Sequence, residues 1–406
     1  MLRRALLVTL LLVGCAPTPG TSGAPAVETI GALVDASGTA AQLGASVQAG
    51  LNVAVEDVNR YLEGRGAGFR VALQSEDPAT DAMAAYGKLK TAGVQAIVGP
   101  VTSGSAASLA APATADGILL LSPSSTAPSL AIDDNLLRFA PVDVLQGVAI
   151  ARAMAEREVK ASVVLARDDV YGNGLAQEVE YAAGLAGITH MGTVTYAADA
   201  TRYDEAIAAL KAKVAEAEAR FGAGKVAVEL VSYDEAGAIM KQAAAAGGLD
   251  QARWFGCDGN AYTGSIATDA EAAAFARATR FLASTFVTPA EAQLPVEVES
   301  PLSTPASLKE RVKLDHPLDT FFFTAYDALW TLALTREQLG TLEDASAVRS
   351  AIYSRSQTFK GTAGVAALNA QGDRATGHYG FFGLGEAPGA WTLEAVYGNT
   401  TYQRLN

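Results

Sequence analysis

The sequence predicts an α/β protein of two lobes, each built around a parallel sheet with helices on both faces. Three observations support this prediction. Short apolar runs alternate with longer helical patterns from Val27 onward, and the alternation restarts after Pro141. The chain has 406 residues, half of them apolar, which is too long for one ordinary domain. Strict alternation of strand and helix places parallel strands side by side beneath covering helices.

The first series of elements precedes Pro141. A helix is expected at 44–62 because Val47, Leu51 and Val55 fall on one helical stripe. The other segments of this series alternate in type, with strands expected at 29–34, 69–73, 96–98, 118–121 and 136–139, and helices at 83–92 and 103–115.

The second series follows Pro141 and has the same rhythm. Its expected strands are 162–165, 188–196, 226–231 and 253–255, and its expected helices are 172–185, 202–220 and 235–246. The end of the chain differs, with helices expected at 319–339 and 345–354 and short strands near 358–365, 379–384 and 391–397. Residues 288–305 are rich in Pro, Glu and Ser and predict an irregular surface loop.

Residues 1–14 are typical of a secretion signal. Arg3 and Arg4 supply a positive start, and residues 5–13 are apolar apart from Thr9. This run is too short to span a bilayer as a permanent helix, so we expect it to be a leader that is removed on export.

Cys15 ends a Leu-Val-Gly-Cys sequence that resembles the lipobox of bacterial lipoproteins. The resemblance implies cleavage before Cys15 and acylation of this residue, which would anchor the chain to a membrane. An ordinary leader with a chance cysteine is the alternative. Residues 15–26 are rich in Pro, Gly, Ala and Thr and predict a flexible tether. Cys257 is the only other cysteine, so the mature chain can form no internal disulfide.

Composition argues against several classes of function. The formal net charge is −13, and no run of Lys or Arg occurs, so nucleic acid is not an expected partner. The three histidines lack metal-ligand spacing, and no Gly-x-Ser-x-Gly turn is present. Residues 219–226 depart from a phosphate loop because Val226 replaces its Ser or Thr. Cys257 has no evident partner base and is better explained as a buried structural thiol. We therefore expect no enzyme.

Hydroxyl side chains follow two strands of the first series. In open parallel sheets, ligands collect where the carboxyl ends of strands meet helix N-termini. Residues 99–105 and 122–126 lie at such junctions and offer hydroxyls beside free backbone N–H groups, which favour a carboxylate or a phosphate. Helix capping by these Ser and Thr residues is the alternative explanation.

The second series offers an acid and a tyrosine at two strand ends. Residues 168–172 include Tyr171, and residues 256–259 include Asp258. An acid in this place can pair with a cationic group, and a tyrosine can cover a ligand. A turn aspartate and an exposed tyrosine are the alternative.

Taken together, these motifs resemble the type I periplasmic binding proteins, specifically the branched-chain amino-acid branch that supplies ATP-binding-cassette importers. The resemblance covers almost everything after the tether. Nine segments carry it in the same order along the chain: 30–33, 43–59, 96–104, 121–128, 138–147, 169–172, 255–259, 324–328 and 359–361.

The resemblance implies two Rossmann-like lobes joined by three hinge crossings. The first lobe would comprise 27–141 and 285–372, and the second 142–284 and 373–406. The family binds its ligand without a cofactor and without chemistry. Its members pass a small solute to a permease, so a monomeric, exported receptor beside a membrane partner is expected.

The resemblance also implies a role for individual residues. Ser103, Ser125 and Thr126 would hold the ligand carboxylate, Tyr171 would close over it, and Asp258 would pair with the α-ammonium. The expected pocket wall comprises Leu43, Val101, Tyr233 and Phe321, and Thr102 is also expected to contact the ligand. An amino acid would then be held by groups from both lobes, so that binding favours closure.

Three departures from the family pattern affect the ligand. Leu43 stands where an aromatic residue is common, Thr102 stands where some members have a disulfide-bonded Cys, and Asp258 replaces a Glu. Relatives with this fold bind amides, urea or aromatic acids, so these ligands remain alternatives to an apolar amino acid. A receptor subunit for a membrane signalling partner is the alternative to import, because the fold serves both.

Overall fold

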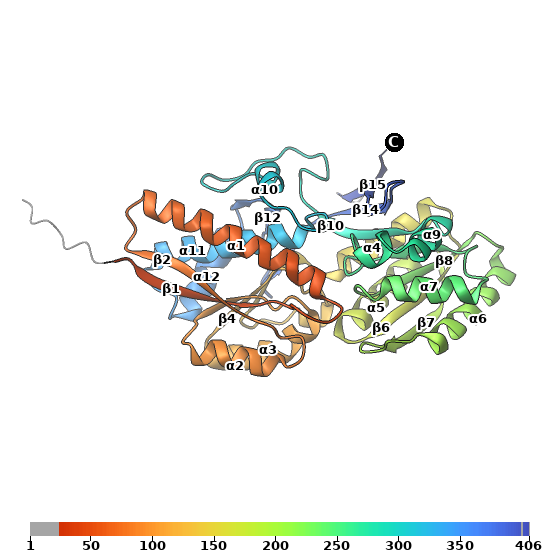
Figure 1. Ribbon diagram of the computed structural model, residues 1–406, viewed down its shortest axis with the longest axis horizontal. Coiled ribbons are helices and arrows are strands. Elements are labelled where there is room, and N and C mark those ends of the chain that lie inside the picture. Colours follow the sequence, from red (N-terminus) through yellow and green to blue (C-terminus); the bar gives the residue numbers. More distant parts are fainter. Residues whose placement is uncertain (1–23, 399–400, 406) are drawn as a thin grey trace, which may run out of the picture.

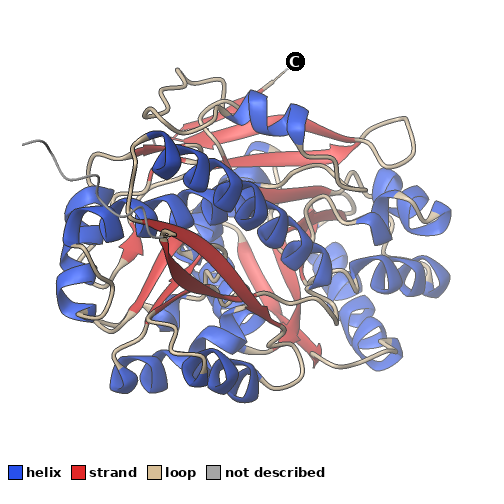
Figure 2. Cartoon of the chain, turned by 60° about the vertical axis from the view of Figure 1, so that its left-hand side comes forward, coloured by secondary structure: helices blue, strands red, loops and turns tan. Residues whose placement is uncertain are grey.

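The computed structural model describes residues 24–398 and 401–405. The predicted leader and Cys15, with most of the predicted tether, lie outside these residues. Two sheets, one in each lobe, organise the described chain along its long axis (Figure 1). In Figure 2 the strands of both sheets lie between helices.

The first lobe contains a six-stranded sheet in the order β13-β5-β4-β3-β1-β2, and all its paired strands are parallel. Its strands are β1 (Ala26–Leu33), β2 (Phe69–Glu76), β3 (Ala96–Val98), β4 (Leu119–Ser122), β5 (Leu136–Pro141) and β13 (Asp373–Arg374). Helices α2 (Ala82–Thr91) and α3 (Ser103–Asp116) cover one face. Helices α1 (Ala41–Gly64), α11 (Thr320–Leu339) and α12 (Ala345–Ser356) cover the other (Figure 1).

Short elements complete this lobe. They are a 3₁₀ turn at Pro128–Leu130, helix α10 (Pro305–Arg311), and the two-stranded ribbon of β11 (Lys360–Gly361) and β12 (Gly364–Val365). Helix α11 is buried on all sides from Thr320 to Ala333, as expected for a helix at the centre of a large core.

The second lobe contains an eight-stranded sheet in the order β16-β15-β14-β10-β9-β8-β6-β7. Its strands are β6 (Ala161–Asp168), β7 (Thr189–Ala197), β8 (Val226–Val231), β9 (Arg253–Gly256), β10 (Leu282–Val287), β14 (His378–Leu384), β15 (Trp391–Gly398) and β16 (Thr401–Arg404). Its helices are α4 (Asp143–Glu156), α5 (Val170–Leu185), α6 (Asp204–Phe221), α7 (Ala236–Ala246), α8 (Gly264–Ala267) and α9 (Ala270–Ala278).

The second sheet contains the predicted parallel strands, and an antiparallel part adjoins them. Strands β6 to β10 pair in parallel, whereas β14, β15 and β16 pair antiparallel with their neighbours. The links between β14, β15 and β16 are short, and short links can join only antiparallel strands.

The chain crosses between the lobes three times, after β5, after β10 and between β13 and β14. Strand β10 pairs with the second sheet through Val287, and β13 joins the first sheet at residues 373–374. The boundaries expected at 285 and 373 are therefore two to three residues too early. Each boundary follows from the sheet that a strand joins. The apolar run that forms β10 continues past residue 285 before the chain leaves the second lobe.

No helix of the described part of the chain is long and apolar enough to cross a bilayer.

Candidate functional site

The carboxyl ends of the parallel strands in both lobes face a common cleft, and the lobes touch across it. The Gln42 amide of α1 donates to the Tyr262 carbonyl over 3.0 Å and accepts from the Gly264 N–H over 2.9 Å. The Asp234 N–H donates to the Thr39 carbonyl over 3.1 Å. These bonds join the first lobe to the second, so the structure is a closed one.

An open cavity of about 510 Å³ lies at the mouth of this cleft. Both lobes contribute to its wall, with Asp35 and Thr102 from the first lobe and Arg167, Asp169 and Tyr233 from the second. Burial raises the pKa of Asp35 to about 7, with a further rise from the charge of Asp77.

Ser103 links the two hydroxyl-bearing loops of the first lobe. It is buried at the start of α3, and its Oγ accepts from the Thr126 N–H over 3.1 Å and from the Ala127 N–H over 3.2 Å. Because the oxygen accepts two bonds, the hydroxyl hydrogen is left to donate to a ligand. The Oγ of Ser125 is also buried and has no partner among the described residues. Two hydroxyl donors are therefore available at this end of the first sheet.

The backbone of these loops leaves no room for larger residues. Gly99 has a φ of 121°, and a Cβ there would lie 2.4 Å from the Leu33 carbonyl oxygen. Below Ser125, the Ser122 hydroxyl donates to the Pro100 carbonyl over 2.7 Å and accepts from the Ser125 N–H over 2.9 Å. Ser122 thus fixes the loop that carries Ser125.

Thr102 caps helix α3, which was the alternative explanation for the hydroxyl residues of this loop. It precedes α3, and its Oγ1 accepts from the Ser105 N–H over 3.4 Å and donates to the Ser105 Oγ over 3.0 Å. Its side chain also borders the cavity at the cleft mouth.

Tyr171 and Asp258 form a buried pair in the second lobe. The Tyr171 hydroxyl donates to Asp258 Oδ1 over 2.5 Å and accepts from the Gly259 N–H over 3.2 Å. Tyr171 and Asp258 are 2% and 5% exposed, so the alternative of an exposed tyrosine is wrong. Asn260 fixes the turn that carries Asp258, because its Oδ1 accepts from the Cys257 N–H over 3.0 Å.

Stacked aromatic and cationic side chains pack against Tyr171 of the Tyr171–Asp258 pair. The Tyr171 ring lies parallel to that of Tyr233, with centroids 5.1 Å apart, and the Arg167 guanidinium lies 4.2 Å from the Tyr233 centroid. Arg167 is held by ion pairs with Asp169 at 2.6 Å and with Glu235 at 2.5 Å. Tyr171 therefore has a fixed position.

Asp143 is a second buried acid, and the sequence analysis missed it. It is the first residue of α4, it is fully buried, and its carboxylate oxygens have no hydrogen-bond partner within hydrogen-bonding distance and angle among the described residues. Burial raises its pKa well above the usual range, and the charge of Asp258 raises it further. The Thr126 hydroxyl and Arg138 oppose this rise. Burial likewise raises the pKa of Asp258.

Gln146 lies one turn after Asp143 on the same helix face. Its Nε2 donates to the Ser284 carbonyl over 3.2 Å and to the Ser284 Oγ over 3.0 Å, while its Oε1 is buried without a partner in the described chain. The spacing of Asp143 and Gln146, three residues within a helix, was the signal that could have identified them.

The predicted wall residues lie in one apolar cluster that spans both lobes. It contains all four, Leu43, Val101, Tyr233 and Phe321, together with Tyr171. Cys257 is also in it as a buried free thiol, as predicted. Their contact with a ligand stays a prediction.

The arrangement suits a small molecule that carries both an anionic and a cationic group. Free hydroxyl donors lie on the first lobe, and two acids within electrostatic reach of each other lie in a desolvated space. Two such carboxylates resist being charged together unless a cation accompanies them. No group of His, Cys, Asp and Glu that could hold a metal ion occurs in the part of the chain that is described.

Comparison with known protein families and relatives identifies the family of this chain. The profile of the family described as the receptor family ligand binding region matches residues 46–385. The chain belongs to this family. An uncharacterised protein of Methanocaldococcus jannaschii is 27% identical over 92% of this chain and 90% of its own length. A leucine-, isoleucine-, valine-, threonine- and alanine-binding protein of Pseudomonas aeruginosa is 28% identical over 83% of this chain and 84% of its own length.

Several solved structures share the fold. A leucine-binding protein of Thermotoga maritima has a TM-score of 0.71 at 19% identity, covering 91% of this chain and 99% of its own. A solute-binding protein of R. palustris in complex with benzoate has a TM-score of 0.69 at 17% identity, covering 91% and 96%. The predicted resemblance to type I periplasmic binding proteins and the predicted two-lobed α/β fold are confirmed. The chain is a solute-binding protein.

Proposed function

We propose that this protein is an exported receptor that captures an apolar α-amino acid and delivers it to an ATP-binding-cassette importer. The observation that carries the proposal is that two buried acids, Asp143 and Asp258, share the closed cleft with the free hydroxyls of Ser103 and Ser125. A zwitterion offers a partner to both kinds of group.

The hydroxyl side of the cleft accounts for the carboxylate of the ligand. Ser103 keeps its hydrogen free, and Ser125 is buried without a partner in the described chain. A hydroxyl that donates to a carboxylate makes a charge-assisted bond, which is stronger than a bond between neutral groups. Thr126 joins them through its N–H bond to Ser103.

The acidic side accounts for the ammonium. Asp258 already accepts from the Tyr171 hydroxyl, while Asp143 has no comparably close hydrogen bond within the described chain. An ammonium has three N–H donors, and bonds to Asp143 and Asp258 would use two of them. The ammonium charge would also remove the repulsion that otherwise keeps one acid protonated.

The same acids argue against an aromatic acid such as benzoate, the ligand of the R. palustris protein. Such a ligand has a carboxylate for Ser103 and Ser125 but no cation for Asp143 and Asp258. Its own charge would add to theirs in a desolvated space. The apolar cluster that contains Leu43, Val101 and Phe321 favours an aliphatic side chain instead.

Isothermal titration of the protein without residues 1–14, unfolded and refolded to remove carried ligand, tests the proposal. The titrants are the common amino acids, benzoate, simple amides and the des-amino analogue of the best amino acid. We expect an apolar L-amino acid to bind most tightly and its des-amino analogue to bind at least a hundredfold more weakly, because the analogue leaves the acids unpaired. Equal affinity for the analogue, or binding of benzoate alone, contradicts the proposal.

A further inference from the structure

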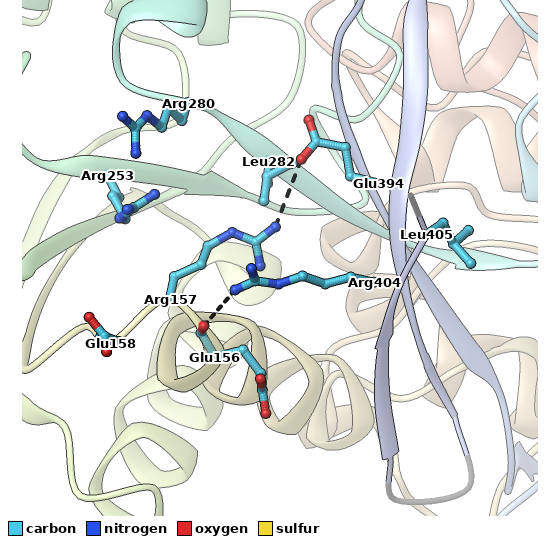
Figure 3. Close-up of a pocket in the computed structure, with 9 residues that line it drawn as sticks. All are labelled: Glu156, Arg157, Glu158, Arg253, Arg280, Leu282, Glu394, Arg404 and Leu405. Atoms are coloured by element: carbon cyan, nitrogen blue, oxygen red, sulfur yellow. Dashed lines mark hydrogen bonds and ion pairs between the residues drawn. The ribbon is translucent and has the colours of Figure 1, made fainter.

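A second cavity, of about 750 Å³, is lined by residues of the second lobe (Figure 3). Arg253 opens β9, Arg280 precedes β10, and Glu158 precedes β6, so the cavity lies where the parallel strands begin. The ligand cleft lies where these strands end. The two sites are therefore separate.

Four arginines from four parts of the fold line this cavity: Arg157 at the end of α4, Arg253, Arg280, and Arg404 in β16. This concentration of positive charge stands out in a chain whose net charge is −13. Like charges repel, so a site of this kind is stabilised by a bound anion.

Two of the four arginines are held in place by the protein. Arg404 Nη2 donates to the Glu156 carbonyl over 2.6 Å, and Arg157 donates to the Tyr402 hydroxyl. Arg157 is mostly buried and lies 5.7 Å from the centroid of the Tyr402 ring. Figure 3 shows Arg157 and Arg404 extending toward each other from opposite sides of the cavity.

The other two arginines are not neutralised within the described residues. The Nε of Arg253 is buried and has no hydrogen-bond partner there. Burial lowers the pKa of Arg253, and the charges of Arg280, Arg157 and Arg404 lower it further, against a smaller opposing effect of Glu158. The other three guanidinium groups therefore lie within electrostatic reach of Arg253.

The acids that line the cavity do not cancel this charge. Glu158 is paired with Lys225 at 2.7 Å, and Glu394 meets Arg157 only at 3.9 Å, with half its side chain exposed. Glu156 contributes its backbone carbonyl, and its carboxylate points away from the arginines in Figure 3. The cavity therefore keeps an excess of positive charge.

We propose that this arginine-lined cavity binds an oxyanion of the phosphate class, either free or carried by a larger molecule such as a lipid headgroup. A guanidinium presents paired N–H donors that match two oxygens of a phosphate group, and four of them surround one space. The cavity is open and larger than an inorganic phosphate, so it can accept a phosphate that remains attached to its carrier.

The test measures binding of inorganic phosphate and pyrophosphate by titration calorimetry, and of vesicles with or without phosphatidylglycerol by flotation. The protein is the full mature chain lacking residues 1–14, with Cys15 replaced by Ser so that no lipid anchor interferes with flotation. The double variant Arg253→Gln/Arg280→Gln removes two unpaired charges. Arg202→Gln is the control, because Arg202 is exposed and paired with Asp204 elsewhere in the lobe.

We expect saturable binding that falls at least tenfold in the double variant and is unchanged in Arg202→Gln. Binding of phosphate or pyrophosphate identifies a free anion as the source, and binding of phosphatidylglycerol vesicles alone identifies a headgroup. Either result supports the proposal, provided that the double variant keeps the amino-acid affinity of the parent protein. Absence of saturable binding to all these probes, or equal binding by the parent and the double variant, overturns it.

Discussion

Two carboxylates in the cleft differ in how the protein supports them. Asp258 accepts a hydrogen bond from the Tyr171 hydroxyl at 2.5 Å, whereas Asp143 lies at the start of a helix without a comparably close bond to either oxygen from the described residues. Asp258 therefore depends less on a ligand to carry its charge. Asp143 depends on the ligand more. Among the described residues, its charged form is favoured by the N-terminus of α4, the Thr126 hydroxyl and Arg138.

Asp258→Asn is expected to weaken amino-acid binding by more than tenfold. The change removes one member of a desolvated charge pair, which costs about 2–5 kcal/mol. Calorimetric titration measures the effect. Asp315→Asn is the control, because the Asp315 side chain is almost fully exposed. An unchanged affinity in Asp258→Asn would remove this residue from the ammonium site.

Asp143→Asn is expected to stabilise the unliganded protein at pH 8, with a benefit that shrinks as the pH falls toward 5. The folded pKa of Asp143 lies above its unfolded value near 3.8, so the folded state binds more protons and its stability falls as the pH rises through this range. The amide cannot ionise and so loses this penalty. His190 and His378 have lowered pKa values and act in the opposite sense, but they are common to both proteins.

Thermal melting of both proteins at pH 5.5, 6.5 and 8 measures this difference. The same variant should bind the amino acid more weakly, because it has lost a partner for the ammonium. A variant that melts below the parent at pH 8 would show that the charge of Asp143 is structural.

Among the secondary-structure elements, strands were predicted most accurately where the apolar run begins and ends abruptly in the sequence. The strands at 96–98 and 226–231 were predicted with the bounds that the structure has. Helix α4, strand β10 and strand β16 were not assigned. Helix α4 begins only two residues after β5, at the first crossing between lobes, so its start was hidden in a segment interpreted as a hinge.

The failure to assign α4 also explains why some site residues could be predicted and others could not. Ser103 begins the helix that follows β3, and Asp258 lies in the turn after β9. The carboxyl ends of strands are recognisable positions for ligands in parallel sheets. Asp143 and Gln146 lie on α4, and an acid in the first turn of a helix has an ordinary explanation in the helix dipole. Their role depends on the second lobe folding back onto α4, which no local pattern records.

Gly44→Ala is expected to destabilise the protein by about 1–3 kcal/mol. A Cβ at Gly44 would lie 1.8 Å from the Asp35 carbonyl oxygen, so α1 must shift away from the end of β1. Denaturant unfolding measures the loss. Gly64→Ala lies in the same helix with open space around it, and it should be neutral or slightly stabilising. Equal effects of the two changes would contradict the argument from close packing.

At the scale of the whole molecule, closure rests on a few polar contacts between the lobes. Gln42 makes two of them, to Tyr262 and Gly264. Because a ligand shared by both lobes binds the closed form, contacts that favour closure add to its apparent affinity.

Gln42→Ala is expected to weaken amino-acid binding by up to about tenfold, mainly through faster release, since two hydrogen bonds of the closed form are lost. Stopped-flow release kinetics measure this effect. Gln48→Ala changes a half-buried side chain of the same helix that donates to Asn52 and makes no hydrogen bond to the second lobe among the described residues, so release should be unchanged. A normal release rate in Gln42→Ala would show that these contacts do not limit opening.

The proposed anchor makes a prediction for the intact chain in its host. Cys15→Ser should prevent acylation and move the protein from the membrane fraction to the soluble exported fraction, because the acyl chains supply the membrane affinity. Fractionation with radiolabelled palmitate detects both changes. A parent protein that takes up no label would show that Cys15 is not a lipidation site.

The three crossings between the lobes also constrain how the chain reaches its native state. The first sheet receives β13 from residues 373–374, and the second receives β14 to β16 from residues after that. Domains usually fold as units during synthesis. Here neither unit is complete until more than nine-tenths of the chain has left the ribosome. A nascent chain that cannot finish either core stays unfolded during synthesis, and an unfolded polypeptide is the form that a translocation channel can thread.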